Sequence, residues 1–276
     1  MNPRALGEGM TATSSRRRTR GRIAYYLPAI AVFLGGLALW ELAVRIFSIE
    51  RFLLPAPSAI AGAFADNAEE LLNAGLTTLV EAAGGFAIGL IAGLVVAFLT
   101  ARFAFARGAL MPFAIAANAI PIVAFAPIAN SWFGIISPLS KMMIVALLVF
   151  FPVMINVVRG LTSAEPAALE LMRSYASSDW TVVRKVRIPA ALPYFFTALK
   201  VSATLSLIGA IVGEYFGGAS EALGRIIVEN AAFLRFSTAW AAIIIAAALG
   251  IAFYLIIVAL ERLVMPWHAS VRGREV

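Results

Sequence analysis

The chain of 276 residues is too apolar for a soluble protein, since 62% of its residues are hydrophobic, 13% are charged and its mean hydropathy is +0.91. Soluble domains are nearer half apolar and a quarter charged, so we expect an integral membrane protein. The lack of cysteine and the single histidine, His268, exclude thiolate and H-E-x-x-H metal sites, and no Gly-Lys pair exists for a P-loop. The net charge of +7 comes from basic residues between apolar runs, which indicates membrane orientation and no nucleic-acid binding.

The first 26 residues include the basic run SSRRRTRGR, and for residues 1–26 we expect a disordered basic tail. Such a run could also belong to a twin-arginine export signal. However, the apolar run that begins at Leu27 is too long for a signal peptide and lacks an A-x-A-like end. We therefore interpret it as an uncleaved first membrane helix.

Six apolar stretches are long enough to cross a membrane, which takes about 20 residues of helix. Each must be helical because lipid offers no partners to an open backbone. The stretches are Leu27 to Ile46, Leu76 to Thr100, Leu110 to Asn130, Leu139 to Val158, Tyr194 to Phe216 and Ala239 to Val264. The sequence thus predicts an all-α integral membrane protein with six transmembrane helices in one domain over 27–264.

The distribution of Lys and Arg predicts how these helices are oriented. With a cytoplasmic N-terminus, the inner segments hold 16 of the 22 basic residues and the outer segments hold five. Lys200, near the inner end of the fifth helix, is assigned to neither side. Because basic residues collect on the cytoplasmic side, we expect both termini inside, with a cytoplasmic tail over 265–276.

Glycine and proline predict special packing in two of the helices. In the second helix, Gly85, Gly89 and Gly93 recur every four residues, which favours close approach of a neighbouring backbone. The third helix contains three prolines, and we expect it to be kinked.

The acidic residues inside the apolar runs include Glu41, Glu81 and Glu214. Glu41 precedes Arg45 by four residues, so the two can pair on one helix face. Glu81 and Glu214 fall near the outer ends of the second and fifth helices, and we interpret them as interfacial carboxylates that water reaches. A proton relay is the alternative, but the sequence gives no convincing second buried titratable group.

A polar stretch from Glu165 to Pro193, EPAALELMRSYASSDWTVVRKVRIPAALP, interrupts the apolar chain. Pro166 suits the first turn of a helix, and the apolar residues that follow recur at three- and four-residue spacing. Ser177, Ser178 and Asp179 are N-cap candidates for a second short helix, which the prolines at 189 and 193 end. Because this helix–turn–helix is too short to form a domain, we expect its apolar face to dock on something in the cytoplasm.

The same stretch resembles the signature cytoplasmic loop of binding-protein-dependent ABC importer permeases. That loop reads Glu-Ala-Ala, three residues, Gly, nine residues, Ile, any residue, Leu, Pro, and the spacing matches from Glu170 to Pro189 without a gap. Leu171 and Met172 replace the alanines, and Ala176 replaces the glycine. Alanine costs roughly 1–2 kcal/mol if the turn keeps a left-handed backbone. Either the turn is rebuilt as right-handed or docking tolerates the strain.

Further segments resemble one branch of this family. LLPAPSAI, IPIVAFAPIANSWFGI and IVGEYFGG are similar to permeases of the nitrate, sulfonate and taurine group, which also includes importers of thiamine-type pyrimidines and riboflavin. LELMRSYASS and RIPAALPYFFTALKV look closest to the last two. The resemblance, over residues 30 to 265, implies a type I ABC importer permease-like fold in the bacterial inner membrane, without a cofactor or enzyme activity of its own.

The resemblance also implies partners and roles. Two permease subunits, here expected to be two copies of this chain, would form the pore beside two cytoplasmic ATPase subunits, with a substrate-binding protein outside. The loop over 159–193 would be the coupling loop that the ATPase moves. Its expected coupling residues are Glu170, Met172, Arg173, Ala176, Trp180, Val186 and Pro189. Glu170 and Arg173 would make polar contacts, Met172 and Trp180 would be apolar anchors, and Pro189 would be a stiff link to the fifth helix. A membrane-surface amphipathic loop without a partner is the alternative.

Polarity and proline kinks place a second set of residues near a solute path. This set consists of Asn118, Pro121, Asn130, Ser206 and Glu214. Polar residues in kinked membrane helices tend to face protein or a water-filled path, so helix packing is the alternative for each.

Two other function classes compete with the importer. A self-contained ion-coupled transporter would show inverted repeats and paired intramembrane charges, and a membrane enzyme would need clustered His, Asp or Glu. The sequence gives no sign of either. For the importer we expect a small organic solute, a thiamine-type pyrimidine or riboflavin, with sulfonate, taurine or nitrate as alternatives.

Overall fold

The computed structural model describes residues 9–219 and 221–267, and in these residues the chain is helical without any strand. The helices are α1 (Gly9–Ile46), α2 (Pro57–Asp66), α3 (Ala68–Arg102), α4 (Ala104–Ala117), α5 (Ala126–Phe133), α6 (Pro138–Thr162), α7 (Pro166–Ser174), α8 (Asp179–Val182), α9 (Ile188–Tyr215), α10 (Leu223–Ala232) and α11 (Phe236–Val264). A 3₁₀ turn, η2 (Ile122–Phe125), precedes α5, and a π-helical segment, η3 (Val183–Arg187), precedes α9.

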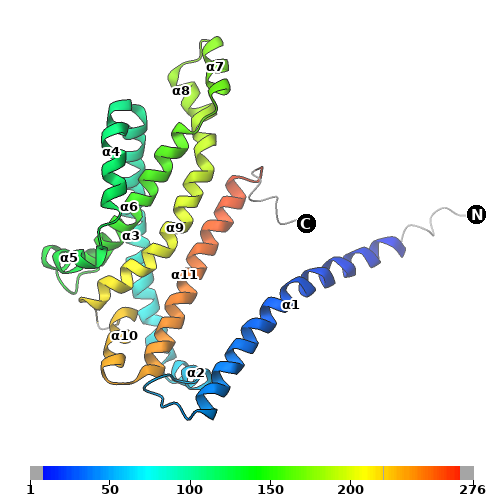
Figure 1. Cartoon of the computed structure of the whole chain (residues 1–276), viewed down its shortest axis with the longest axis vertical. Helices are drawn as coiled ribbons and strands as arrows, with labels where there is room; N and C mark the ends of the chain where they lie inside the picture. The colour runs from blue at the N-terminus through cyan, green and yellow to red at the C-terminus, as the bar shows by residue number, and fades with distance from the viewer. Residues whose placement is uncertain (1–8, 220, 268–276) are drawn as a thin grey trace, which may run out of the picture.

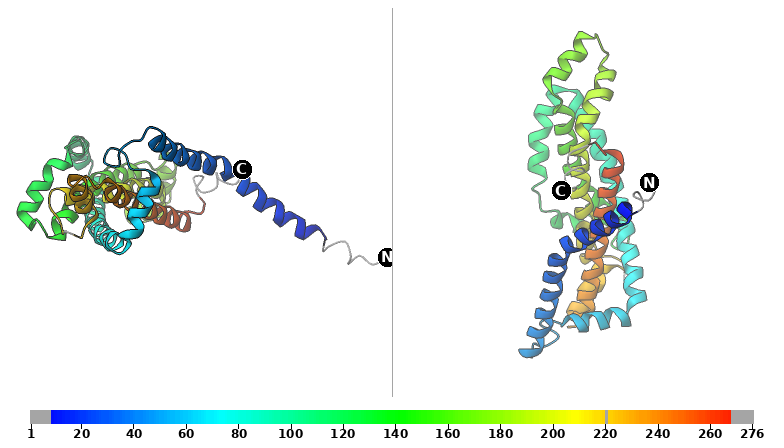
Figure 2. Two further views of the ribbon diagram at one scale, coloured as in Figure 1. Left: turned by 90° about the horizontal axis from the view of Figure 1, so that it is seen from below. Right: turned by 90° about the vertical axis from the view of Figure 1, so that its right-hand side faces the viewer.

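The long helices α3, α6, α9 and α11 form an elongated bundle (Figure 1). The short helices α7 and α8 project from one end of this bundle, here called the α7 end. The helices α2 and α10 lie at the opposite end, here called the α10 end. α1 meets the rest of the molecule beside α2 and leans away from the bundle (Figure 2). The start of α1 and the end of α11 both point away from the α10 end.

Five of the six predicted crossings are single long helices. Five helices are long and apolar enough to span a membrane, with mean hydropathies between 1.8 and 2.9. The prediction of a single kinked helix over Leu110 to Asn130 is wrong, because α4 ends at Ala117 and the chain turns by 88° before α5. Pro121 has no N–H to continue the helix, and the residue before a proline avoids helical geometry. Counting this bent pair as one span gives six.

The glycine repeat holds α3 against α6, as predicted. A Cβ atom on Gly85 would lie 2.5 Å from the Met142 carbonyl oxygen, and one on Gly89 would lie 2.4 Å from the Ala146 carbonyl oxygen. Both distances are far below van der Waals contact. The two backbones therefore touch along this face, and the buried valines of α6 fill the adjoining space.

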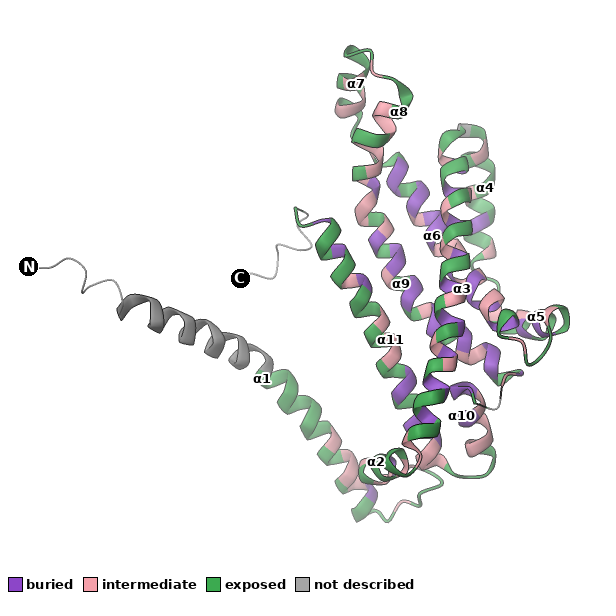
Figure 3. Ribbon diagram, turned by 180° about the vertical axis from the view of Figure 1, so that it is seen from behind, coloured by how far each residue is buried: buried purple, intermediate pink, exposed green. Residues whose placement is uncertain are grey.

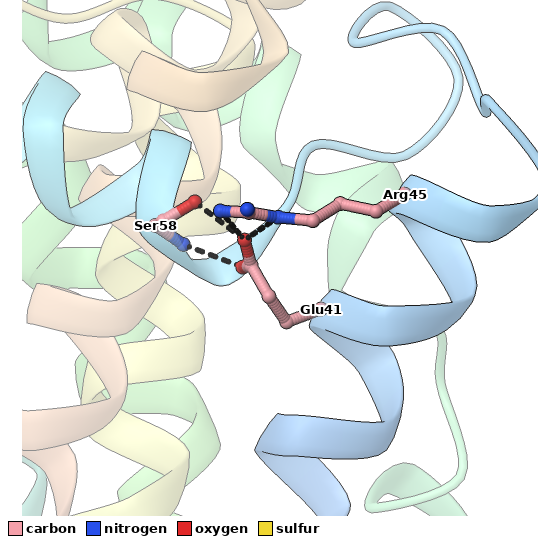
Figure 4. A network of polar contacts seen from close by, with 3 residues as sticks. All are labelled: Glu41, Arg45 and Ser58. Carbon is pink, nitrogen blue, oxygen red and sulfur yellow. Dashed lines mark hydrogen bonds and ion pairs between the residues drawn. The ribbon is translucent and has the colours of Figure 1, made fainter.

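The contact between α1 and α2 includes the predicted pair of Glu41 and Arg45. The Arg45 Nε donates to Glu41 Oε1 at 2.7 Å (Figure 4). The same carboxylate accepts hydrogen bonds from the backbone N–H and the hydroxyl of Ser58, at 3.0 and 2.8 Å. Glu41 thus satisfies a free N–H at the start of α2, where Ala56 in the N-cap position has no side chain to do so.

The termini differ in part from the expected tails. Residues 9–26 belong to α1, whereas the sequence favoured a disordered tail over 1–26. Arginine is a good helix former, and no proline occurs between Gly9 and Leu27, so the membrane helix continues in this direction. Residues 1–8 and 268–276, with the rest of both predicted tails, lie outside the described residues.

Gly89→Ala is expected to lower the melting temperature of the purified protein, because the added methyl group would overlap the Ala146 carbonyl oxygen. Overpacking of this kind costs roughly 1–3 kcal/mol. Gly250→Ala in α11 is the matched control, since a Cβ there meets nothing within 4 Å and alanine favours the helix. Thermal unfolding of both variants in the same detergent gives the comparison. Equal melting temperatures would contradict the close contact of α3 with α6.

Candidate functional site

The stretch that interrupts the apolar sequence forms α7, α8 and η3, which extend beyond the bundle at the α7 end. Pro166 occupies the first turn of α7, as predicted. Of the three N-cap candidates for the second helix, Ser178 is the cap of α8, because its hydroxyl accepts a hydrogen bond from the Thr181 N–H at 3.3 Å. Neither helix has a buried residue, and most of their surface is exposed (Figure 3).

α7 ends in a Schellman motif whose left-handed residue is Ala176. The Ser177 N–H donates to the Met172 carbonyl at 3.1 Å, and the Ala176 N–H donates to the Arg173 carbonyl at 2.9 Å. Ala176 has a φ of 49°, in the region that favours glycine. Of the two alternatives left by the sequence, the chain therefore keeps the left-handed turn, at a cost of about 1–2 kcal/mol for alanine.

Several large apolar side chains are exposed at this end of the molecule. Trp180 is 68% exposed, Tyr175 is 73% exposed and Leu171 is 57% exposed. Glu170 and Arg173 are exposed beside them, whereas Met172 and Val186 are half-buried. The apolar face that the sequence predicts consists of Leu169, Met172 and Tyr175 or Ala176. It does not include Leu171, although the i, i+4 spacing of Leu171 and Tyr175 places them on one face of α7.

The connection from α8 to α9 is continuous, which corrects the prediction that Pro189 and Pro193 end the second helix. The Ile188 N–H donates to the Val183 carbonyl across the π-helical turn of η3. Pro189 lies in the first turn of α9, where its missing N–H is tolerated, and Pro193 lies inside α9. The helical path from α8 through η3 to the end of α9 covers 37 residues, from Asp179 to Tyr215.

The five residues expected near a solute path lie in two kinds of environment. Asn118 and Pro121 are exposed at the break between α4 and η2. Asn130 is buried and donates from Nδ2 to the Phe216 carbonyl at 3.2 Å, and the buried Ser206 hydroxyl donates to the Ala203 carbonyl at 2.8 Å. Glu214 is fully buried. The structure therefore brings these residues to no single surface.

The interpretation of Glu81 and Glu214 as interfacial carboxylates is wrong, because both are buried and lie together with Lys141. Glu81 is 2% exposed, while Glu214 and Lys141 are 0% exposed. Lys141 is the second titratable group nearby that sequence reasoning did not find. The sequence shows that Lys141 lies near the start of a membrane helix. Helical periodicity shows which residues share its face, but not which neighbouring helix that face meets.

No metal centre accompanies these groups within the part of the chain that the structure describes. There, no three His, Cys, Asp or Glu side chains lie close enough together to hold a metal ion.

An exposed ion pair joins the bundle to the projecting helices. Arg102, at the end of α3, lies 3.5 Å from Asp179 of α8.

Comparison with known proteins gives a family match and close relatives. Residues 85–266 match the family described as binding-protein-dependent transport system inner membrane component. The riboflavin transport system permease protein RibX of Chloroflexus aurantiacus is 33% identical over 266 residues, covering 95% of this chain and 98% of RibX. The formylaminopyrimidine transport permease protein ThiX of Halalkalibacterium halodurans is 32% identical over 237 residues, covering 86% of this chain and 94% of ThiX.

The fold has a counterpart among solved structures. A chain from the crystal structure of an amino acid ABC transporter with histidines superposes with a TM-score of 0.57 and 18% sequence identity. The match covers 72% of this chain and 94% of that one. At this identity the likeness concerns the fold alone, and it confirms the predicted type I ABC importer permease-like architecture.

Ala176→Gly is expected to stabilise the turn after α7, because glycine accepts a φ of 49° without the methyl clash. A gain of about 1 kcal/mol corresponds to roughly fivefold slower hydrogen exchange of the Ala176 and Ser177 amides. Exchange measured by mass spectrometry on peptides over 166–180 tests this. Ala167→Gly in the first turn of α7 is the control and should speed exchange, since glycine is a poorer helix former than alanine. Faster exchange in Ala176→Gly would contradict a strained turn.

Proposed function

The chain belongs to the family of binding-protein-dependent transport system inner membrane components, and on this premise we propose that it lines the solute path of an ATP-driven importer whose ATPase docks on α7 and α8. Membership makes the chain a multi-pass protein of the bacterial inner membrane and a permease subunit of an ABC importer. The ATPase, the substrate-binding protein and a second copy of the chain are the partners that this function requires.

The exposed apolar surface of α7 and α8 carries the proposal. Leu171, Tyr175 and Trp180 together offer a contact surface that no other described part of the chain covers. Buried aromatic anchors surrounded by polar residues dominate protein–protein interfaces. Glu170 and Arg173 supply the polar contacts at the edge of this surface, and the Ala176 turn fixes the angle between the two helices.

Helix continuity supports a role of this surface in coupling. A displacement of α8 by the ATPase passes through η3 into α9 without a flexible loop between them. π-helical turns often occur at functional hinges. We therefore assign to η3 the adjustment between the docked helices and the membrane helix, and to Pro189 the rigid start of α9.

The placement of basic residues supports a cytoplasmic α7 end. Arg102 at the end of α3, Arg159 at the end of α6 and the basic residues of η3 all lie toward this end. Lys and Arg collect on the cytoplasmic side of membrane proteins. In this orientation both termini are cytoplasmic, and the α10 end faces the substrate-binding protein outside.

The break between α4 and η2 supports a second copy of the chain. Asn118 and Pro121 are exposed in a non-helical turn within an otherwise apolar hairpin of helices. Non-helical backbone is unstable against lipid, but it is tolerated against protein or a water-filled cavity. A second permease that packs against α4 and α5 would enclose this turn and complete the path.

The relatives support a solute class. RibX and ThiX, which are named for the transport of riboflavin and formylaminopyrimidine, match 95% and 86% of this chain at 33% and 32% identity. We propose a small heterocyclic solute of the pyrimidine or riboflavin kind.

A self-contained ion-coupled transporter is the second candidate, because the buried charges of Glu81, Lys141 and Glu214 are the intramembrane feature that such a transporter requires. The two candidates differ in their energy source. In membrane vesicles, we expect uptake to stop when vanadate blocks ATP hydrolysis and to persist when an uncoupler removes the proton gradient. The reverse result would assign the chain to the second class.

Trp180→Ala is expected to lower uptake at least tenfold and to reduce co-purification of the ATPase in mild detergent, because it removes the largest exposed anchor of α8. Membrane insertion should stay unchanged, since Trp180 is 68% exposed. Trp267→Ala is the control, because Trp267 is also exposed, at 56%, but lies after α11. Normal uptake and normal ATPase association in Trp180→Ala would exclude the proposed docking surface.

A further inference from the structure

Three charged side chains meet inside the bundle toward the α10 end, where membrane proteins rarely bury charge without a purpose. Glu81 comes from α3, Lys141 from α6 and Glu214 from α9. All three are almost completely buried. They are called the EKE cluster below. The cluster belongs to none of the contacts proposed for the ATPase.

Glu214 serves as the N-terminal cap of α10. The residue in the N-cap position of α10 is Ala222, which has no oxygen to accept from the free N–H groups of the first turn. Instead, Glu214 Oε2 accepts from the Gly224 N–H at 2.6 Å, and Thr78 Oγ1 accepts from the Leu223 N–H at 3.1 Å. A negative charge at a helix N-terminus is also favoured by the helix dipole.

Gly224 is required for this contact. A Cβ atom at this position would lie 2.7 Å from the Glu214 Cβ and 2.8 Å from its Oε2. The start of α10 and the end of α9 are therefore in direct contact, with the carboxylate between them. α10 thus takes its cap from two other helices, α3 and α9, and its position depends on theirs.

Lys141 ties a third segment to the cluster. Its ammonium group donates hydrogen bonds to the carbonyl oxygens of Ile135 and Ser137, in the loop between α5 and α6. The same loop packs on the turn after α9, where a Cβ atom on Gly217 would lie 2.5 Å from Ile135 Cγ2. The α5–α6 loop, the end of α9 and the start of α10 therefore meet around one set of charges.

Hydrogen bonding assigns different protonation states to the two acids. Glu81 Oε2 and Glu214 Oε1 are both buried without a hydrogen-bond partner among the described residues. Two carboxylates beside one ammonium group would leave an uncompensated negative charge in a buried site, so one of the acids carries a proton. Glu214 accepts from the Gly224 N–H, whereas no donor to Glu81 is present among the described residues, so the proton belongs on Glu81. With Lys141 charged, the cluster is then neutral, as a low-dielectric site requires.

We propose that Glu81, Lys141 and Glu214 are positioning residues for transport: an ionised Glu214 beside a protonated Glu81 fixes α10 to the bundle, and Lys141 fixes the α5–α6 loop, at the mouth of the solute path. This inference rests on the proposed function, which makes the α10 end the outer mouth. Movement of α9 then moves α10 with it, because the cap is carried by α9. Neither the family match nor the relatives' names assign a role to these three residues.

The assignment predicts that two isosteric substitutions differ. Glu81→Gln keeps a donor toward Glu214, so the cap should persist. Glu214→Gln replaces the carboxylate by a neutral amide with only one acceptor oxygen. Its N–H₂ group would then face either the Gly224 N–H or the protonated Glu81, and both of these are donors. Residues that merely fill space would tolerate both changes equally. Glu81→Leu removes the donor and should behave like Glu214→Gln.

Because the chain has no cysteine, a single introduced cysteine can report on α10 without background labelling. Ile227→Cys places the thiol at a site of α10 that is 8% exposed, and Ala232→Cys, at an exposed site, is the control. In membranes, we expect a membrane-impermeant thiol reagent to label Cys at 227 at least tenfold faster when Glu214→Gln or Glu81→Leu is added. Addition of Glu81→Gln should leave the rate within twofold, and labelling at 232 should be the same throughout.

The assembled transporter provides the second measurement. In Glu214→Gln, ATP hydrolysis stimulated by the loaded binding protein should fall at least tenfold, while basal hydrolysis stays within twofold of wild type. Glu81→Gln should retain both. Wild-type labelling in Glu214→Gln, or equal damage by Glu81→Gln and Glu214→Gln, would overturn the inference. If Glu214→Gln fails to insert, Glu81→Gln and Glu81→Leu make the same comparison. A wild-type complex without ATP-driven uptake would instead overturn the proposed function, because the labelling assay needs no partner.

Discussion

The requirement that every backbone N–H and C=O find a partner inside the membrane governs this molecule. Long helices satisfy it locally, and the glycine face of α3 lets α6 approach until the two backbones touch. The requirement is met less directly at three places: the turn at Asn118 to Pro121, the π-helical turn η3 and the start of α10. η3 keeps its bonds in the wider π pattern, whereas the start of α10 takes its partners from Glu214 and Thr78 of other helices. These places coincide with the proposed second permease, the coupling path and the EKE cluster, so the departures from regular helix mark the functional parts.

The membrane helices and the ends of the short loop helices could be predicted from the sequence, for clear physical reasons. A run such as Ala239 to Val264 has no stable alternative to a membrane helix, and Pro166 and Ser178 act within one turn of their own helix ends. At Ala176 the motif narrowed the turn to a strained left-handed or a rebuilt right-handed backbone, and the structure has the left-handed one. In these cases the residues that decide the structure are close together in the chain, so one sequence contains the necessary information.

The rest depends on contacts between distant segments. Proline predicts a kink in the third crossing, but the 88° turn depends on how α5 packs against α6. Sequence gives the depth of Glu81 and Glu214 along their helices, but not the rotation that turns both toward Lys141. The cap of α10 is the clearest case, because Leu223 and Thr78 are 145 residues apart. Leu171 was missed because the predicted apolar face of α7 runs through Leu169 and Met172, which the chain itself half covers.

α9 connects the two sites through one rigid element. Its first turn contains Pro189, next to the helices proposed to meet the ATPase, and its last turn contains Glu214, which caps α10. A helix of this length spans about 40 Å, close to the full thickness of a membrane with its interfaces. Since Thr78 on α3 holds the same first turn of α10, a shift of α9 relative to α3 breaks the Leu223–Thr78 bond if α10 follows α9, and the Gly224–Glu214 bond if α10 stays with α3. A hydrogen bond to a charged acceptor is worth about 1.5–3 kcal/mol, against about 0.5–1.5 kcal/mol for one to a neutral hydroxyl. α10 therefore follows α9, and this is how closure at the cytoplasmic end would reach the outer mouth.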